Sequence, residues 1–153
     1  MHLRNWQQKI IDTYPLIIKQ NHRFILKAPT GAGKTVLASE IIGRFYKDKK
    51  IVVLCHRLVL LEQLEDVLSK NHSVRKLAVS DKGPAFDGYD VLLSTSMRAK
   101  DVLADAILKA DLIIVDEAHR AKKVESLANQ FLQVLKTKKL WLLTGTPVAN
   151  RPV

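Results

Sequence analysis

The sequence predicts an α/β fold with a mainly parallel central sheet, and three observations support this prediction. Short apolar runs rich in β-branched residues alternate with longer segments of helical spacing. Each run has the length of a buried strand, and strands that alternate with helices form βαβ units around a parallel sheet. The chain has 153 residues, of which 47% are hydrophobic and 26% charged, as expected for one folded domain.

The elements follow one another along the chain. A first helix carries Trp6, Ile10 and Ile11, and Pro15 interrupts it or starts a new helix. The expected strands span residues 23–28, 51–55, 90–94, 112–116 and 140–144, with a weaker one at 74–79. Residues 81–88 form a turn-rich loop, and Cys55 and Trp141 are expected in the core. Helices between the strands carry apolar stripes at Leu37/Ile41/Phe45, Leu61/Leu64/Leu68, Val102/Leu103/Ala106/Ile107 and Val124/Leu127/Ala128/Phe131/Leu135.

Charge and composition narrow the function. The net charge of +10 favours a polyanionic partner, most simply nucleic acid, although a basic surface also serves solubility. The apolar runs are a few residues long, whereas a membrane span needs roughly 20, so no membrane partner is expected. The N-terminus lacks a secretory apolar stretch, and the single cysteine excludes an internal disulfide. We therefore expect an intracellular protein of the cytoplasm, nucleoid or nucleus that is not secreted.

A glycine-bearing loop follows the first expected strand, where residues 28–35 read APTGAGKT before a helix. Gly31 and Gly33 allow backbone angles that turn N–H groups toward a phosphate, and the helix points its positive end there. Lys34 is placed to reach the β- and γ-phosphates, and Thr35 to ligate Mg²⁺. The first glycine of the strict phosphate-loop pattern is alanine here. The alternative is a plain glycine turn into a helix.

Polar residues also end two later strands. Residues 112–119 read LIIVDEAH, so an apolar strand delivers Asp116 and Glu117 to its end. Asp116 is placed to hold Mg²⁺ through water, and Glu117 to orient or deprotonate an attacking water. The alternative is a helix N-terminus enriched in acids. The last strand runs into TGTP, where Thr144 and Thr146 could sense a γ-phosphate or mark an ordinary exit from the strand.

These motifs, in this order and spacing, resemble those of superfamily 2 helicases and translocases. GAGKT resembles motif I, DEAH motif II and TGTP motif III. Residues 3–7 (LRNWQ) are similar to the LRxxQ element, whose glutamine reads adenine. Residues 54–57 (LCHR), running on to Glu62 and Gln63, are similar to motif Ia, and residues 94–96 (STS) sit where motif Ib lies. The tail TGTPVANRP resembles Swi/Snf-type translocases and phage or repair relatives.

The resemblance implies a RecA-like P-loop NTPase fold, a three-layer sandwich in which the motif III strand lies between those of motifs I and II. It implies ATP and Mg²⁺ as cofactors and nucleic acid as partner, with DNA favoured over RNA. The ATP-binding residues it implies are Arg4, Gln7, Thr30, Gly31, Ala32, Gly33, Lys34 and Thr35, with Trp6 or Arg4 flanking the base.

The remaining roles also follow from the resemblance. Lys34 and Glu117 are the catalytic residues, and His119, with Thr144 and Thr146, couples the ATP site to movement. Nucleic acid is expected to contact Arg57, Gln63 and Thr95, although Arg57 and Gln63 also fit polar positions of an amphipathic helix.

The expected function is the ATP-binding first lobe of a nucleic-acid helicase or translocase, with residues 1–153 as one lobe. No second lobe, with its arginine finger, follows in this sequence, so little activity is expected of the chain alone. Three origins stay open: an excised lobe, a lobe completed by another chain, or a protein that only binds ATP. The alternative function is a regulatory or adaptor module that acts on a helicase or nuclease partner.

Overall fold

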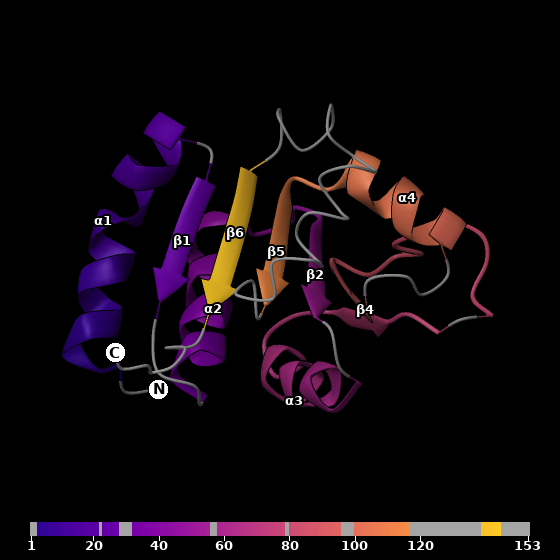
Figure 1. The fold of residues 1–153 in the computed structure, drawn as a ribbon, viewed down its shortest axis with the longest axis horizontal. Helices are drawn as coiled ribbons and strands as arrows, with labels where there is room; N and C mark the ends of the chain where they lie inside the picture. The colour runs from indigo at the N-terminus through magenta and orange to yellow at the C-terminus, as the bar shows by residue number, and fades with distance from the viewer. Residues whose placement is uncertain are drawn as a thin grey trace, which may run out of the picture.

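The computed structural model describes residues 3–21, 23–27, 32–55, 58–78, 80–95, 100–116 and 139–144 (Figure 1). The fourth expected helix, at residues 124–135, lies outside these ranges. Among the described residues, no helix is long and apolar enough to cross a membrane. The described helices are α1 (Asn5–Asn21), α2 (Ala32–Phe45), α3 (Leu58–Leu68) and α4 (Lys100–Lys109). The described strands are β1 (Arg23–Lys27), β2 (Ile51–Cys55), β3 (Val74–Lys76), β4 (Val91–Thr95), β5 (Leu112–Asp116) and β6 (Lys139–Thr144).

The described strands form one sheet in the order β1-β6-β5-β2-β4-β3, and every neighbouring pair is parallel. The predicted α/β fold with a parallel sheet is therefore confirmed. The strand that leads into TGTP, β6, lies between β1 and β5, as the resemblance implied. Figure 1 shows β1, β6, β5 and β2 side by side with their arrowheads at the same edge. The carboxyl ends of the strands thus share one edge of the sheet.

Helices cover both faces of the sheet, because alternate residues of a strand point to opposite sides. On one face, α1, α2 and α3 share an apolar cluster with Val53 and Cys55. On the other face, α4 packs in a second cluster with Val52 and Leu54. Two helical layers around one sheet make the expected three-layer sandwich. Cys55 and Trp141 are both buried in the first cluster, which confirms their assignment to the core.

Helix α1 runs unbroken through Pro15, so the expected interruption there is wrong. A proline inside a helix removes one backbone hydrogen bond and costs about 3 kcal/mol. Ile11, Tyr14 and Ile18, spaced three and four residues apart, are buried on one face of this helix. Burying each such side chain contributes about 1.5–3 kcal/mol, which offsets the cost of the proline.

The apolar stripe of α2 ends differently from its prediction. Leu37 and Ile41 are buried, but Phe45 is 39% exposed and Tyr46 takes the buried place after the helix ends. Ile42 is buried too, and Tyr46 lies four residues after it with its N–H still donating to the carbonyl of Ile42 across 3.0 Å, so the buried face continues from Ile42 and leaves Phe45 beside it.

The boundaries of three strands also shift. The strand expected at 140–144 begins one residue earlier, at Lys139. The weak strand expected at 74–79 ends at Lys76, although the N–H of Leu77 still donates to the carbonyl of Leu93 across 2.8 Å. The strand expected at 90–94 occupies Val91–Thr95.

The predicted turn-rich loop contains two glycines in the left-handed region, Gly83 at φ 87° and Gly88 at φ 88°. These angles explain why the loop needs glycine there.

Candidate functional site

The carboxyl edge of the sheet brings together the strands that carry the sequence motifs. In the strand register, Asp116 of β5 lies beside Leu143 of β6, which lies beside Leu26 of β1. Neighbouring strands are about 4.8 Å apart, so the backbones of Asp116 and Leu26 are about 10 Å apart. The carboxyl end of β5 therefore lies at the same edge of the sheet as that of β1, two strands away.

Helix α2 begins at Ala32, so four predicted ATP-binding residues, Ala32, Gly33, Lys34 and Thr35, lie in its first turn. Lys34 is buried, at 5% exposure, and Thr35 is partly buried. The N–H groups of a first helical turn carry partial positive charge, so this is a place where phosphate is stabilised. Thr30 and Gly31, the other predicted loop residues, lie outside the described ranges.

The reason for glycine at position 33 differs from the prediction. Gly33 lies within α2 and is not in the left-handed region, so it needs no unusual backbone angle. A Cβ built there would lie 3.1 Å from Cζ2 and 3.6 Å from Cη2 of Trp6, and 3.7 Å from Nη1 of Arg4. The first turn of α1 thus packs so closely on Gly33 that any side chain at position 33 would meet the indole ring of Trp6.

Gln7 is the predicted adenine-reading residue, and it is buried at 3% exposure. Its Oε1 accepts a hydrogen bond from the backbone N–H of Arg4 across 2.8 Å, and its Nε2 donates to the carbonyl of Gly33 across 2.9 Å. Gln7 is the third residue of α1, so its bond to the N–H of Arg4 is one half of a capping box. The two bonds together fix the orientation of the amide, with its nitrogen toward Gly33 and its oxygen toward the N–H of Arg4.

The other predicted residues of the ATP site are described only partly or not at all. Asp116 and Thr144 end β5 and β6, and the structure describes their backbone positions. Glu117, His119 and Thr146 lie outside the described ranges, so their proposed roles remain predictions.

Two of the predicted nucleic-acid residues, Thr95 and Gln63, lie at the half of the molecule that contains β2, β4 and α3. Thr95 ends β4 beside Cys55, the last residue of β2. Gln63 is exposed on α3, and the exposed acids Glu62 and Asp66 lie on the same helix. Arg57 lies outside the described ranges. A phosphate backbone near Gln63 therefore also meets two negative charges.

A buried aromatic group, which no local sequence pattern predicts, links the elements around the site. The indole N–H of Trp141 donates to the Tyr14 hydroxyl across 2.8 Å, and this hydroxyl is also hydrogen-bonded to that of Tyr46. Burial, with the neighbouring hydroxyl adding to it, holds the pKa of Tyr14 above its usual range, and burial likewise raises the pKa of Tyr46. These three side chains tie α1 and the end of α2 to β6.

A cavity of about 350 Å³ lies at the opposite edge of the sheet. Its lining includes Ile51 and Val91, the first residues of β2 and β4, together with Gly43 and His72. It is therefore separate from the edge where the predicted site residues meet.

Comparisons with known proteins agree with this arrangement. Residues 1–149 match a family described as type III restriction enzyme, res subunit. The Bacillus subtilis (strain 168) protein "Uncharacterized ATP-dependent helicase YqhH" is 28% identical over 150 residues, which are 94% of this chain and 26% of that protein. The Danio rerio "Chromodomain-helicase-DNA-binding protein 1-like" is 31% identical over 165 residues, covering 98% of this chain and 16% of that protein.

One solved structure is similar over nearly the whole chain. The Sulfolobus solfataricus SWI2/SNF2 ATPase core, solved in complex with dsDNA, has a TM-score of 0.74 and 26% identity and covers 99% of this chain. This chain spans 33% of that one, so it matches only part of its relatives. Because the family match covers residues 1–149, the chain belongs to the type III restriction enzyme res subunit family, and its fold is that of the N-terminal RecA-like lobe of superfamily 2 helicases.

Proposed function

We propose that the chain binds Mg·ATP and serves as the first lobe of an ATP-dependent nucleic-acid helicase or translocase. One observation carries the proposal. The amide of Gln7 is held against Gly33, next to the buried Lys34 at the start of α2. An amide for a base and a cation for phosphates thus lie close together, where α1 meets the start of α2.

The residues around α2 fit the phosphates of a nucleotide. Lys34 supplies a positive charge, and the first turn of α2 supplies backbone N–H groups. In this proposal Thr35 and Asp116 hold Mg²⁺, and Glu117 orients the attacking water. Bound Mg·ATP brings the transferable phosphoryl group, while Lys34 and the helix start hold it in place.

The geometry of Gln7 supports adenine as the base. A side-chain amide has two donor hydrogens and two acceptor lone pairs. The contacts with Arg4 and Gly33 use one acceptor position and one donor of Gln7. The remaining acceptor and donor match the amino group and ring nitrogen of adenine, whereas guanine presents a carbonyl where adenine has its amino group.

The net charge of +10 supports nucleic acid as the partner of the half of the molecule that contains β2, β4 and α3, where Thr95 and Gln63 lie. The Sulfolobus relative was solved with dsDNA, which favours DNA over RNA and a location inside the cell, in the cytoplasm, nucleoid or nucleus. Motor action needs a second lobe that opens and closes on the nucleotide, supplied by a longer chain or by a partner protein.

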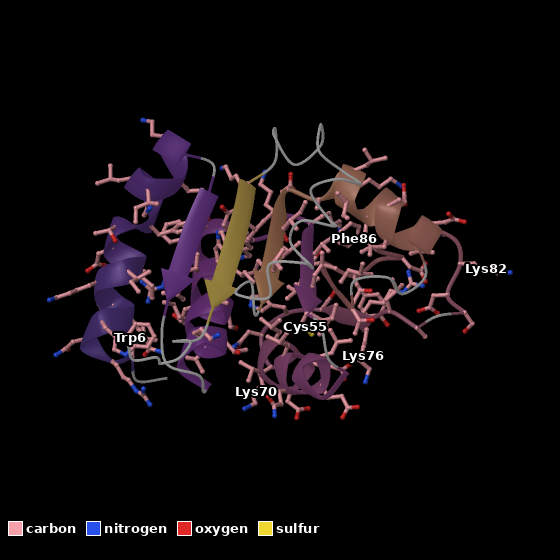
Figure 2. The ribbon with its side chains drawn as sticks, viewed as in Figure 1. Trp6, Cys55, Lys70, Lys76, Lys82 and Phe86 are labelled. Atoms are coloured by element: carbon pink, nitrogen blue, oxygen red, sulfur yellow. The ribbon has the colours of Figure 1, made fainter. Side chains whose placement is uncertain are left out.

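Calorimetric titration with Mg·ATP tests the proposal. Lys34→Ala is expected to weaken binding at least about tenfold, because it removes the charge that faces the phosphates. Lys82→Ala is the matched control, since Lys82 is exposed and lies at the far end of the molecule from Trp6 (Figure 2). Equal affinities for the wild type and Lys34→Ala, with both folded by circular dichroism, contradict the proposal.

A further inference from the structure

The indole of Trp6 lies against the first turn of α2, at Gly33. Its Cζ2 and Cη2 atoms are 3.1 and 3.6 Å from the position that a Cβ of Gly33 would occupy. Trp6 is partly buried and packs on the apolar cluster shared by α1 and α2, and this packing restricts the movement of its ring. The ring edge therefore limits how far Gly33 can move toward α1.

Gly33 is also restrained by a polar contact. Its carbonyl accepts the hydrogen bond from Gln7 across 2.9 Å, while the indole of Trp6 meets the Cα side. One helical turn, at the start of α1, thus restrains the residue directly before Lys34 through two adjacent side chains. The indole of Trp6 therefore restrains the backbone directly before Lys34.

We propose that Trp6 is a positioning residue that fixes the start of α2, at Gly33 and Lys34, for the polyphosphate part of a nucleotide, whichever base it carries. The inference rests on the proposed function, since it requires Mg·nucleotide to bind at Lys34. Holding these residues in their bound conformation removes an ordering cost from binding. Because the indole of Trp6 lies against the side of Gly33 where a Cβ would be, directly before Lys34, its effect acts on the phosphates, whereas the Gln7 amide acts on the base.

The test separates these two effects with two ligands, Mg·ATP and Mg·tripolyphosphate, which has no base. Trp6→Leu keeps an apolar side chain on the cluster but is too short to place atoms where Cζ2 and Cη2 lie. We expect Trp6→Leu to weaken the binding of both ligands by a similar factor of about tenfold, and to leave the ATP-to-GTP affinity ratio unchanged. Trp6→Phe is expected to restore part of the affinity.

Tryptophan fluorescence adds a second measurement, because emission from Trp6 would not respond to ligand if Trp6 had a purely structural role. The chain has two tryptophans, so in Trp141→Phe the emission comes from Trp6 alone. Emission from Trp6 is expected to change on adding Mg·tripolyphosphate as well as Mg·ATP, and Trp6→Leu should show no such change. Urea unfolding and circular dichroism of each variant check that it is folded.

Four results overturn the inference. An emission change with Mg·ATP but none with Mg·tripolyphosphate makes Trp6 a contact of the base. A Trp6→Leu variant that loses affinity for Mg·ATP alone also makes Trp6 a base contact, and one that loses affinity for neither ligand removes the positioning role. If the wild type binds Mg·ATP no more tightly than Lys34→Ala does, the proposed function fails first and this inference fails with it.

Discussion

The side-chain amide of Gln7 donates a hydrogen bond to the backbone carbonyl of Gly33 across 2.9 Å, joining residues 26 positions apart. The oxygen of the same amide accepts from the N–H of Arg4 at the start of α1. The first bond reaches the start of α2 and the second caps the start of α1. Gln7 therefore connects the N-terminal helix to the residues that are proposed to hold phosphate.

Replacing Gln7 by Glu tests this connection. Glutamate has nearly the same shape and keeps an acceptor for the N–H of Arg4, but it places a second acceptor opposite the carbonyl of Gly33. Leaving buried acceptors without a donor costs about 1–3 kcal/mol. We expect a loss of stability of this size in urea denaturation, together with a loss of the preference for ATP over GTP in competition titrations.

Gln8→Glu is the control for the added charge, since Gln8 lies one residue further along α1 and donates to Asp12 on the exposed side. It should retain the ATP preference of the wild type. If Gln7→Glu also keeps both its stability and that preference, the amide of Gln7 does not read the base.

Much of the fold could be predicted from the sequence, because a parallel sheet covered on both faces needs continuous apolar strands. Residues 51–55 and 112–116 are such runs, and both are strands within these bounds. The helix that starts at Ala32 could be predicted for a related reason, since glycines and Lys-Thr after a strand form a local pattern, whereas its binding of phosphate stays a prediction. The place of β6 between β1 and β5 came from the resemblance to helicases and was confirmed.

What could not be predicted depends on contacts between distant residues. Judged by its local preference alone, Pro15 is expected to break a helix. Burial of Ile11, Tyr14 and Ile18 keeps α1 continuous. The approach of Trp6 to Gly33 depends on how α1 packs on α2, which no local pattern contains. A glutamine three positions into a helix was the available signal for the capping bond, yet its second partner is fixed by tertiary structure.

A double-mutant cycle measures the contact between Trp6 and Gly33. Alanine is favoured over glycine within a helix by about 1 kcal/mol. In the wild-type background a Cβ at position 33 meets the indole at 3.1 Å, so Gly33→Ala should be neutral or destabilising. In the Trp6→Leu background the same change should stabilise by about 0.5–1 kcal/mol in urea unfolding. Additive effects of the two changes mean that the indole does not restrict position 33.

Alkaline pH tests the buried aromatic group. The folded pKa of Tyr14 lies above the unfolded value of about 10, so stability from its neutral hydroxyl is complete below pH 10. As pH rises above 10, the unfolded chain releases this proton and the folded chain does not, so stability falls. Tyr14→Phe should flatten this fall in melting temperature, and cost about 1–3 kcal/mol at neutral pH because the indole N–H of Trp141 loses its acceptor.

Tyr46 belongs to the same group and its pKa is raised too, so some alkaline destabilisation should remain in Tyr14→Phe. Tyr89→Phe, at a tyrosine that is 41% exposed, is the matched control and should keep the wild-type profile. A Tyr14→Phe profile that parallels the wild type from pH 8 to 11.5 contradicts the role of this hydroxyl.

Binding to nucleic acid is expected to be weak, independent of sequence and strongly reduced by salt. Phosphate contacts by basic groups release counterions, so a plot of log affinity against log salt concentration should have a negative slope. Fluorescence anisotropy with a labelled DNA duplex, at 50 and 200 mM NaCl, measures this slope. An affinity that is unchanged between the two salt concentrations contradicts the proposed phosphate contacts.

Substitution of an acidic residue beside Gln63 tests where on the surface these DNA contacts lie. Glu62 is exposed next to Gln63, so a DNA backbone at Gln63 is repelled by its carboxylate. Glu62→Gln removes this repulsion and should strengthen DNA binding about two- to fivefold at 50 mM NaCl, and less at 200 mM, where charges are screened. Asp101→Asn makes the same change of net charge on α4, which packs on the opposite face of the sheet. If both variants gain equally, net charge explains the effect and α3 does not face the DNA; a gain confined to Glu62→Gln places the DNA along α3, beside the carboxyl ends of β2 and β4.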